Sequence, residues 1–393
     1  MDTTDPMLPG ASQAPGTASP PDYGWPTQSA TAAPPAPAPP DPADRIGGPS
    51  RRRRWPVAVA AVASVVVVAA VAGLLIRIPY DTIAPGSARR VDDLIAVKDH
   101  PTYPAAGRVL FTTVSVRDRV DVWEALAGWL DPNVDVLKEK DVTGNQPEAQ
   151  FHQENVAAMA DSKAAAEAVA LRHLGYTELG GGAQIVSVQS GLPASASLKA
   201  DDVIVAVDGT PVTGPADVRP LIQKHKTGDG IRLSIVRGTA PAADMTVTLG
   251  ADGTGQPLLG VLLTTKLKLP FGVTIDSGNV EGPSAGLAYS LALLDVLTPG
   301  ELTGGVKVAA TGELAADGSV APIGGVAQKV VAVERAGATM FLVPKDNYAE
   351  AKAHAGGRLR VVAIGSYDDA LRALGGLPGS NAASFAQAGG GAS

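Results

Sequence analysis

The longest apolar stretch of the chain, Trp55–Ile76, contains no charged side chain and ends at Arg77. As a helix rising about 1.5 Å per residue, it would span the roughly 30 Å of a bilayer core. It lacks the polar face that a helix on a soluble core would show. It is also longer than the apolar region of a signal peptide, about 7–15 residues, and it begins far from the N-terminus. We therefore expect an uncleaved transmembrane helix over residues 55–77.

Residues 1–54 show no comparable apolar run. Thirteen of the 32 prolines fall in the first 50 residues, among Ala, Ser, Thr and Gly, a composition that cannot offset the entropy of an ordered chain. We expect a disordered Pro/Ala-rich tail that ends in the basic segment Arg51–Arg54. Because four arginines precede the span and one follows it, the positive-inside bias places this tail in the cytoplasm. The expected location is a cell membrane crossed once, with everything after the span outside the cytoplasm.

Short apolar runs follow, at Asp92–Val97 and Arg108–Val116, and a helical pattern with two tryptophans covers Asp121–Leu130. The Ala-rich stretch Pro147–Leu174 has few helix breakers and predicts a long helix. We interpret residues 78–174 as a small mixed α/β leader with a helix that links it to the next domain.

Residues 175–250 alternate short strands with one helix. The elements in order are a strand at Ala183–Val188, a strand and tight turn within Asp201–Val212, a helix at Asp217–Lys226 and a strand at Gly230–Gly238. The tight turn is expected at Asp208-Gly209. This β-rich order resembles a PDZ domain of the bacterial protease type.

The PDZ resemblance implies a peptide-binding site. It places the glycine run Gly180, Gly181 and Gly182 where such domains hold the loop whose backbone amides bind a peptide carboxylate. A peptide would then add as a strand beside Ile185 and Val186, with its side chains against the following helix. The alternative for this region is a β-rich spacer with a flexible glycine linker.

From residue 251 onward, strands and helices alternate, which predicts a layered α+β or α/β domain over residues 251–375. The expected strands are Leu258–Leu263, Val306–Ala310, Thr339–Val343 and Leu359–Ile364. The expected helices are Pro283–Leu297, Val326–Ala336, Asp346–Ala353 and Tyr367–Leu374. The Gly/Ala/Ser-rich residues 376–393 predict a flexible tail.

A candidate nucleophile lies in the segment EGPSAGLA, which begins at Glu281. Pro283 suits the first position of a helix, so we expect Ser284 in the first helical turn, where free amides and the helix dipole favour negative charge. Those amides could stabilise a tetrahedral oxyanion. Gly282 and Gly286 would allow a substrate backbone to approach closely.

A serine hydroxyl needs a base to become a nucleophile. The candidate is Lys329, 45 residues after the serine, at the start of a helix with valines around it. A helix N-terminus and partial burial both disfavour the ammonium ion and lower the lysine pKa. Thr311 could hydrogen-bond the amine. A lone lysine would normally be solvated, so only the combined pattern indicates a Ser-Lys hydrolase.

The motifs EGPSAG, TGE at Thr311 and PIGGVAQK, which ends at Lys329, resemble the proteolytic domain of Lon-type serine peptidases over Leu258–Leu374. With the apolar span and the PDZ-like segment ahead of it, the chain resembles the membrane-anchored, PDZ-containing Lon-like proteases of bacteria. The resemblance implies an α+β multidomain fold whose proteolytic domain forms hexameric rings in many relatives. It implies Ser284 as nucleophile and Lys329 as general base, with supporting roles for Thr311, Glu281, Gly282 and Pro283. Glu281 stands where Asp is more familiar.

The same sequence argues against several other chemistries. No GxxxxGK[ST] motif occurs, so we expect no nucleotide and no ATP-driven unfolding. Zero cysteines exclude disulfides and thiolate metal sites, and a net charge of −7 without a basic stripe offers nothing to nucleic acid. No metal or cofactor is expected. The expected partners are protein or peptide substrates and the lipid bilayer.

Two alternatives remain open at this stage. Residues 282–286 also satisfy G-x-S-x-G, the nucleophile elbow of α/β-hydrolases, for which His354 would be the base and Asp346 or Asp317 the acid. The chain could instead be a membrane-tethered, peptide-binding scaffold whose Lon-like domain is inactive.

Overall fold

The computed structural model describes residues 55–144, 146–177 and 179–386. The predicted tail of residues 1–54, including Arg51–Arg54, lies outside the described residues. The chain divides into two compact units, Met1–Ala63 and Ser64–Ser393. Of the first unit, only the beginning of helix α1 is described.

Helix α1 spans Trp55–Leu75 and agrees closely with the predicted transmembrane segment. It is long and apolar enough to cross a membrane, and little of it is buried in the protein. Its valines and leucines are mostly exposed, which distinguishes it from the core helix of a soluble domain.

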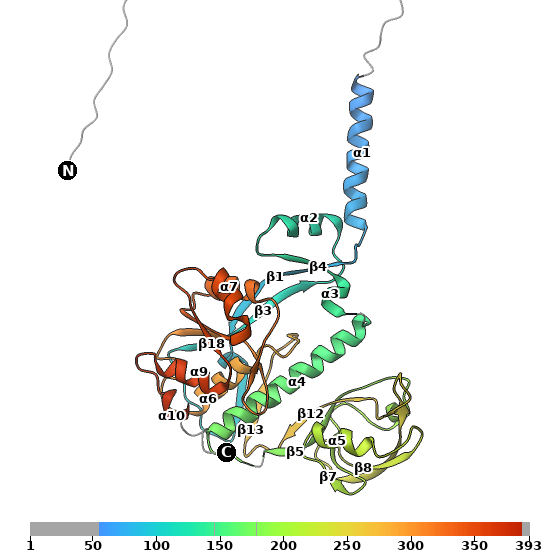
Figure 1. Cartoon of the computed structure of the whole chain (residues 1–393), viewed down its shortest axis with the longest axis vertical. Coiled ribbons are helices and arrows are strands. Elements are labelled where there is room, and N and C mark those ends of the chain that lie inside the picture. The colour runs from blue at the N-terminus through green and yellow to red at the C-terminus, as the bar shows by residue number, and fades with distance from the viewer. Residues whose placement is uncertain (1–54, 145, 178, 387–393) are drawn as a thin grey trace, which may run out of the picture. The chain divides into compact units, whose positions relative to one another are not determined.

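The first of the two six-stranded sheets has the order β18-β17-β14-β3-β1-β4. In this order the strands are Arg360–Ile364, Met340–Pro344, Lys307–Ala310, Arg108–Arg117, Tyr80–Arg90 and Asp135–Lys138. The first four run parallel, and β1 and β4 add in antiparallel fashion. The sheet therefore combines strands from both ends of the described chain (Figure 1).

This pairing corrects the prediction of a separate leader over residues 78–174. Leu110 of β3 lies opposite Ala309 of β14 in a parallel ladder, and Phe111 packs against Tyr289 with ring centroids 5.7 Å apart. Strands β1, β3 and β4 of the predicted leader thus belong to the same sheet as β14, β17 and β18 of the predicted proteolytic domain. Pairing between strands about 200 residues apart leaves no trace in local periodicity.

Helices cover both faces of this sheet. One face packs against α4 (Glu148–His173), α6 (Gly286–Leu297) and α9 (Tyr367–Gly375), and the other against α7 (Val326–Arg335) and α8 (Tyr348–His354). These helices were all expected, and their ends differ from the predictions by up to three residues. The short helix η4 (Lys345–Asn347) takes the first two residues predicted for α8.

The second sheet is antiparallel, in the order β12-β5-β6-β8-β9. Its strands are Val261–Leu267, Gly180–Val188, Val203–Val207, Gly230–Val236 and Ala243–Thr248, and helix α5 covers Pro215–Ile222. Asp208 and Gly209 have φ of 48° and 78°, which confirms the predicted tight turn between β6 and β7 (Thr210–Pro211). The sheet has its own apolar core.

The PDZ-like segment extends further than predicted and is inserted into the larger domain. Strand β12, expected to open the proteolytic domain, instead pairs with β5, as Figure 1 shows. The segment enters and leaves at adjacent residues, because the amide of Lys268 donates to the carbonyl of Leu179 at 2.8 Å. The sheet of the PDZ-like segment therefore continues to Leu267, beyond the boundary predicted at residue 250.

The predicted tail begins too early in the sequence. Asn381 donates its side-chain amide to the carbonyl of Pro299 at 2.9 Å, Ala382 is buried, and Ala383–Ala386 form helix α10. Residues 376–386 therefore pack on the domain; residues 387–393 lie outside the described residues.

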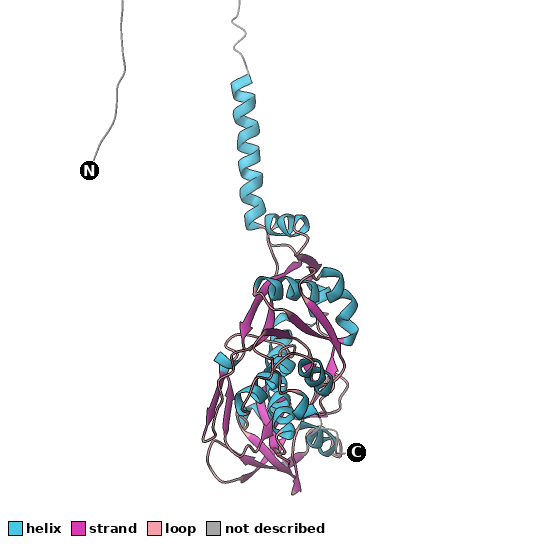
Figure 2. Ribbon diagram, turned by 90° about the vertical axis from the view of Figure 1, so that its left-hand side faces the viewer, coloured by secondary structure: helices cyan, strands magenta, loops and turns pink. Residues whose placement is uncertain are grey.

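Smaller elements complete the chain (Figure 2). They are η2 (Asp92–Leu94), β2 (Ile95–Lys98), α2 (Val122–Leu130), α3 (Glu139–Thr143), η3 (Pro193–Ala196), β10 (Gly250–Ala251), β11 (Pro257–Leu258), β13 (Gly272–Ile275), β15 (Glu313–Leu314) and β16 (Val320–Ala321). Helix α2 begins with a capping box formed by Asp121 and Glu124. This capping box fixes the start of the helix directly after Asp121.

Candidate active site

Ser284 lies in the turn that leads into α6, two residues before the first helical residue, Gly286. The prediction of a helix beginning at Pro283 is therefore wrong by three residues. The carbonyl of Ser284 accepts hydrogen bonds from the amide of Gly312 (2.9 Å) and the hydroxyl of Thr311 (3.1 Å). Since these partners occupy it, the regular helical hydrogen bonds begin only after the serine.

The loop of residues 281–285 carries the candidate nucleophile Ser284, and we name it the nucleophile loop. Helix α4 holds it in place. Gly282 has a φ of +84°, a conformation that residues with a Cβ rarely adopt, so glycine is required for the bend. Three contacts join the loop to the helix: Gly282 N to Asn155 O (3.1 Å), Ser162 Oγ to Pro283 O (2.9 Å) and His152 Nδ1 with Glu281 Oε2 (3.0 Å). Glu281 thus binds a residue of α4.

Sequence reasoning found α4 but missed the residues on it that hold the nucleophile loop. Ser162 is buried, with 3% of its surface exposed. A Cβ at Gly286 would come within 2.7 Å of its hydroxyl. The only signal in the sequence is a serine on the inward face of an Ala-rich helix, and such a residue more often bonds to its own backbone.

Lys329 comes from α7, which follows the left-handed residue Gly325. Its side chain is 2% exposed and lies among the buried valines Val326 and Val330. Its Nζ is 2.9 Å from Ser284 Oγ. Burial lowers the pKa of this lysine to about 7, because the ammonium ion loses its hydration. The amine is therefore poised to accept a proton near neutral pH.

Thr311 connects the other two residues. It is fully buried directly after β14, and its Oγ1 lies 3.2 Å from Lys329 Nζ. The same hydroxyl donates to the carbonyl of Ser284, as described above. A single side chain therefore fixes the amine and the backbone of the serine relative to each other.

The amides of Ser284 and Ala285 donate no hydrogen bond to any residue that the structure describes. Both lie in the turn ahead of α6, where amides lack helical acceptors and carry partial positive charge. This turn thus offers donors for an oxygen that develops negative charge on attack by Ser284.

A cavity of about 300 Å³ adjoins the nucleophile loop. Its walls come from α4, from β12 of the PDZ-like sheet and from the segment around β15; they include Asp161, Ser162, Thr265, Leu267, Pro283 and Leu314. Strand β12 of the PDZ-like sheet and the loop that carries Ser284 therefore line the same cavity.

The residues of the alternative hydrolase triad do not gather at Ser284. His354 is exposed at the end of α8, with its Nδ1 3.0 Å from the carbonyl of Glu350. Asp346 is exposed in η4. Asp317 is also exposed, and it accepts a hydrogen bond from the amide of Ser319.

The predicted peptide-binding residues occupy a different setting from the one expected. Gly180, Gly181 and Gly182 lie inside β5, not in a loop before it, and the amide of Gly182 donates to Thr213 O at 3.3 Å. Ile185 is fully buried in the core. Strand β5, which includes Val186, pairs with β12 over most of its length and with β6 at Ala183 and Gln184. Strand β12, distant in sequence, thus lies along the edge of β5 that was expected to receive the peptide. A peptide-binding role for these residues stays a prediction.

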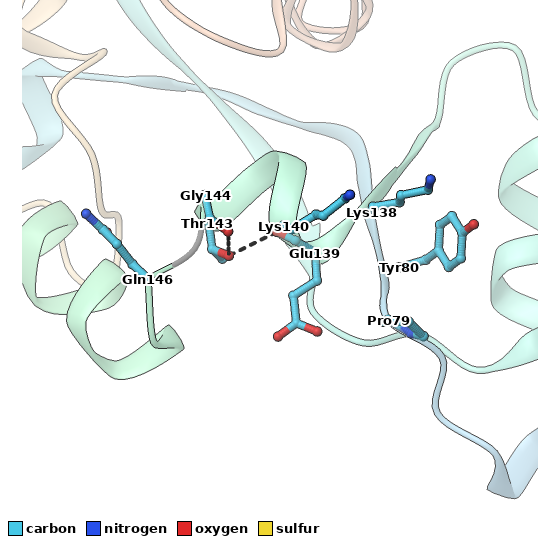
Figure 3. A pocket seen from close by; sticks show the side chains of 8 residues that line it. All are labelled: Pro79, Tyr80, Lys138, Glu139, Lys140, Thr143, Gly144 and Gln146. Carbon is cyan, nitrogen blue, oxygen red and sulfur yellow. Dashed lines mark hydrogen bonds between the residues drawn. The ribbon is translucent and has the colours of Figure 1, made fainter.

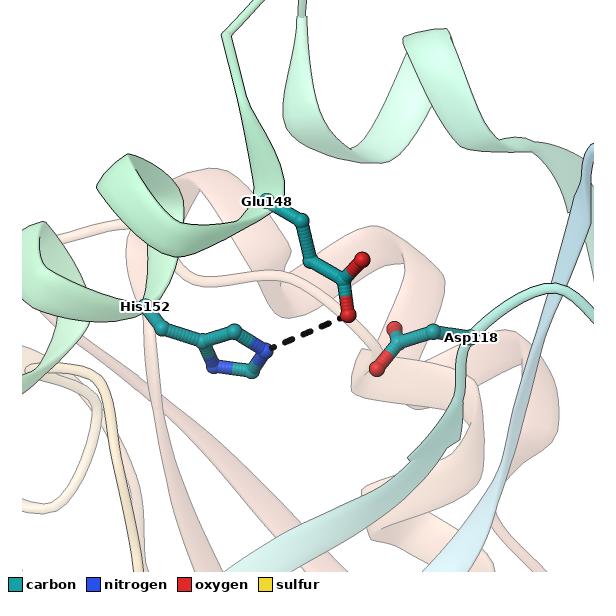
Figure 4. Close-up of side chains that lie close together, drawn as sticks. All are labelled: Asp118, Glu148 and His152. Atoms are coloured by element: carbon teal, nitrogen blue, oxygen red, sulfur yellow. Dashed lines mark ion pairs between the residues drawn. The ribbon is translucent and has the colours of Figure 1, made fainter.

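One cluster of metal-ligand types lies near Glu281. Asp118, Glu148 and His152 offer ligand atoms that all fall within 4.8 Å of one another (Figure 4). Hydrogen bonding to Glu281 raises the pKa of His152, and nearby Asp118 and Glu148 add to the effect. All three cluster residues are exposed. Such exposed groups form ordinary surface ion pairs, and we assign no metal here.

Known proteins resemble two parts of the chain. Residues 267–374 match the Lon protease (S16) C-terminal proteolytic domain, and residues 169–248 match the PDZ domain family. The Lon protease of Clostridium beijerinckii is 37% identical over 105 residues, which cover 25% of this chain and 13% of that relative. The Lon protease of Methylocella silvestris is 42% identical over 96 residues, covering 24% and 12%. The matched part is thus about an eighth of the length of these relatives.

Among solved structures, the PDZ domain of an SdrC-like protein from Listeria monocytogenes is 28% identical, covers 21% of this chain and 86% of that structure, and gives a TM-score of 0.20. The described elements and the two family matches give a mixed α and β fold with one apolar helix long enough to cross a membrane. The chain therefore contains a Lon-type proteolytic domain and a PDZ domain.

Proposed function

We propose that this protein is a membrane-anchored serine endopeptidase that cleaves extracytoplasmic proteins or peptides without ATP, using Ser284 and Lys329. The observation that carries the proposal is the 2.9 Å separation between Ser284 Oγ and the Nζ of a lysine that is 2% exposed. Burial of an ammonium ion is unfavourable. A lysine without a functional role would therefore be expected to extend into solvent and not to lie buried against a serine hydroxyl.

The proposed reaction follows from this contact. Neutral Lys329 accepts the hydroxyl proton as Ser284 Oγ bonds to the carbonyl carbon of the scissile peptide, and the amides of Ser284 and Ala285 bind the resulting oxyanion. The lysine ammonium then donates its proton to the departing amine as the C–N bond breaks. In the second half, the neutral lysine takes a proton from water as the water oxygen bonds to the acyl carbon. The lysine ammonium then returns a proton to Ser284 Oγ as the acyl C–O bond breaks. Thr311 holds the amine in place throughout.

We propose that the PDZ domain brings substrates to this site. Strand β12 is the terminal strand of the PDZ sheet, and Thr265 and Leu267 of this strand line the cavity beside Pro283. An extended substrate held near β12 would be close to the nucleophile loop, which raises its local concentration there. The anchor α1 would restrict the enzyme to substrates at the membrane surface, with the catalytic domain outside the cytoplasm because of Arg51–Arg54.

The test is hydrolysis of a fluorogenic peptide by the full chain in lipid vesicles without nucleotide. We expect turnover that Ser284→Ala abolishes and that Ser290→Ala leaves intact. Ser290 is a suitable control because it is a buried serine of α6 whose hydroxyl has no partner among the described residues. Peptide binding without turnover in the unaltered protein would instead support a scaffold.

A further inference from the structure

Helix α2 buries its small residues and exposes its large apolar ones. Ala125 and Gly128 are buried, and a Cβ at Gly128 would come within 2.7 Å of Val136. The exposed large side chains of the helix are Val122, Trp123, Leu126, Trp129 and Leu130, with Trp129 60% and Leu130 78% exposed. A helix of a soluble protein normally has the opposite arrangement.

The exposed apolar side chains of α2 share one face. At about 100° per residue, all five fall within an arc of about 120°. Two of the four tryptophans of the chain are among them. Five large apolar side chains on a nine-residue helix form a contiguous patch, and such patches indicate a surface that another apolar phase covers.

The position of α2 indicates what that phase is. The indole Nε1 of Trp123 donates to the carbonyl of Ala70 in α1 at 2.9 Å, and a Cβ at Gly73 would overlap the same indole. Arg77, just after α1, pairs with Glu124 at 3.2 Å. Helix α2 is therefore fixed beside the C-terminal turns of α1. In Figures 1 and 2 it lies beside the lower end of that helix.

The contacts between α2 and α1 also indicate how deep α2 would lie in the bilayer. Ala70 precedes the end of α1 at Leu75 by five residues, which corresponds to about 7.5 Å along the helix axis. Amphipathic helices lie about 5–10 Å deep, at the boundary between headgroups and acyl chains. Tryptophan favours this boundary because its ring is apolar and its N–H is polar.

Cationic groups occupy the adjoining surface. A cavity of about 420 Å³ is lined by Pro79, Tyr80, Lys138 and Lys140, among others (Figure 3). The carbonyl of Pro79, four residues beyond α1, accepts from the amide of Glu139 at 3.2 Å. Lys138 and Lys140 are therefore close to the membrane end of the domain, where lysines can contact anionic headgroups.

We propose that the exposed face of α2 inserts into the outer leaflet of the lipid bilayer and forms a second membrane contact beside α1. This inference rests on the membrane anchoring proposed above. With two contacts, the catalytic domain is held in one orientation on the membrane.

The test uses the absence of cysteine from the chain. Single nitroxide labels are placed on Leu126→Cys and Leu130→Cys in the full chain, in vesicles of phosphatidylcholine and phosphatidylglycerol. Collision of each label with oxygen, which partitions into lipid, is compared with collision with a water-soluble nickel chelate. Val156→Cys is the matched control, because it is an exposed apolar residue (46%) on α4. Val66→Cys reports on α1.

We expect an oxygen-to-nickel ratio at both α2 positions that exceeds the ratio at Val156 by at least about threefold, as for side chains at the acyl boundary. If the Val66 label is in lipid but the α2 labels are as accessible to nickel as Val156, the α2 inference is wrong and the anchor stands. If the Val66 label is itself in water, the proposed anchoring fails. Labels on α2 that are shielded from both reagents would indicate a protein partner and would also overturn the lipid assignment.

Discussion

The proteolytic domain and the PDZ domain differ in how their functional surfaces depend on the rest of the chain. In the proteolytic domain, Ser284, Thr311 and Lys329 meet as their residue types suggested. In the PDZ domain, the strand expected to bind peptide is paired along one edge by β12 and, at Ala183 and Gln184, along the other by β6. A reactive group can be recognised from its chemistry, whereas a free strand edge depends on which distant strand pairs there.

The largest effect is expected when the proposed general base, Lys329, is removed from the proteolytic domain. Lys329→Met keeps an apolar side chain of similar length in the buried site, so the fold should persist while peptide hydrolysis falls by at least about a thousandfold. Steady-state kinetics would measure the fall. His354→Ala should retain nearly full activity, and a loss there as large as in the lysine variant would return the histidine to the mechanism.

Replacing Thr311 by Val removes the hydroxyl and keeps the shape of the side chain. Without the contact to the amine, Lys329 is less well oriented, and kcat should fall by about 10–100-fold. Thr311→Ser retains the hydroxyl and should recover much of the rate. Equal rates for the valine variant and the unaltered protein would exclude an orienting role.

The PDZ side of the comparison can be sharpened by excising the inserted domain. Because Leu179 and Lys268 are hydrogen-bonded neighbours, residues 180–267 can be replaced by a short glycine linker that keeps the two ends together. Cleavage of a protein substrate should fall by about tenfold or more while cleavage of a short peptide changes little, since only recruitment is lost. Parallel losses for both substrates would mean that the PDZ domain supports the fold of the proteolytic domain.

A smaller effect is expected from Ser162→Ala. Loss of the bond to Pro283 O should loosen the nucleophile loop and lower kcat by about tenfold with KM unchanged, in line with roughly 1–2 kcal/mol for one buried hydrogen bond. Ser290→Ala again serves as the control. A matching drop in thermal stability for both variants, without a difference in kcat, would mean that Ser162 has only a structural role.

Much of the helical structure could be predicted because it depends on local signals. Three short motifs were enough to single out Ser284, Thr311 and Lys329, which the structure brings together. The helix at Val326–Arg335 agreed to within one residue, and α2 is defined by its own capping box. The contacts that could not be predicted join segments distant in sequence. They are the pairing of β3 with β14, the pairing of β12 with β5 and the packing of α4 on the nucleophile loop. No local period or motif encodes them.

The start of α6 shows a subtler failure. Pro283 is favourable at a helix start, but the carbonyl of Ser284 is already bonded to Thr311 and Gly312. Tertiary hydrogen bonds thus overrode a sound local preference at the residue with the most important proposed role. This pattern is typical of functional sites, where local rules yield to the geometry of the chemistry.

The central claim is that Ser284 is activated by a buried lysine that is largely neutral near physiological pH. The most direct measurement is the rate at which a fluorophosphonate labels the full chain in vesicles as a function of pH, with the labelled residue identified by mass spectrometry. With the pKa of Lys329 at about 7, the neutral, proton-accepting form increases with pH, so labelling at Ser284 should accelerate about tenfold between pH 6 and 8 and then level off. Labelling at another residue, a flat profile over this range, or equally fast labelling of Lys329→Met would contradict the account.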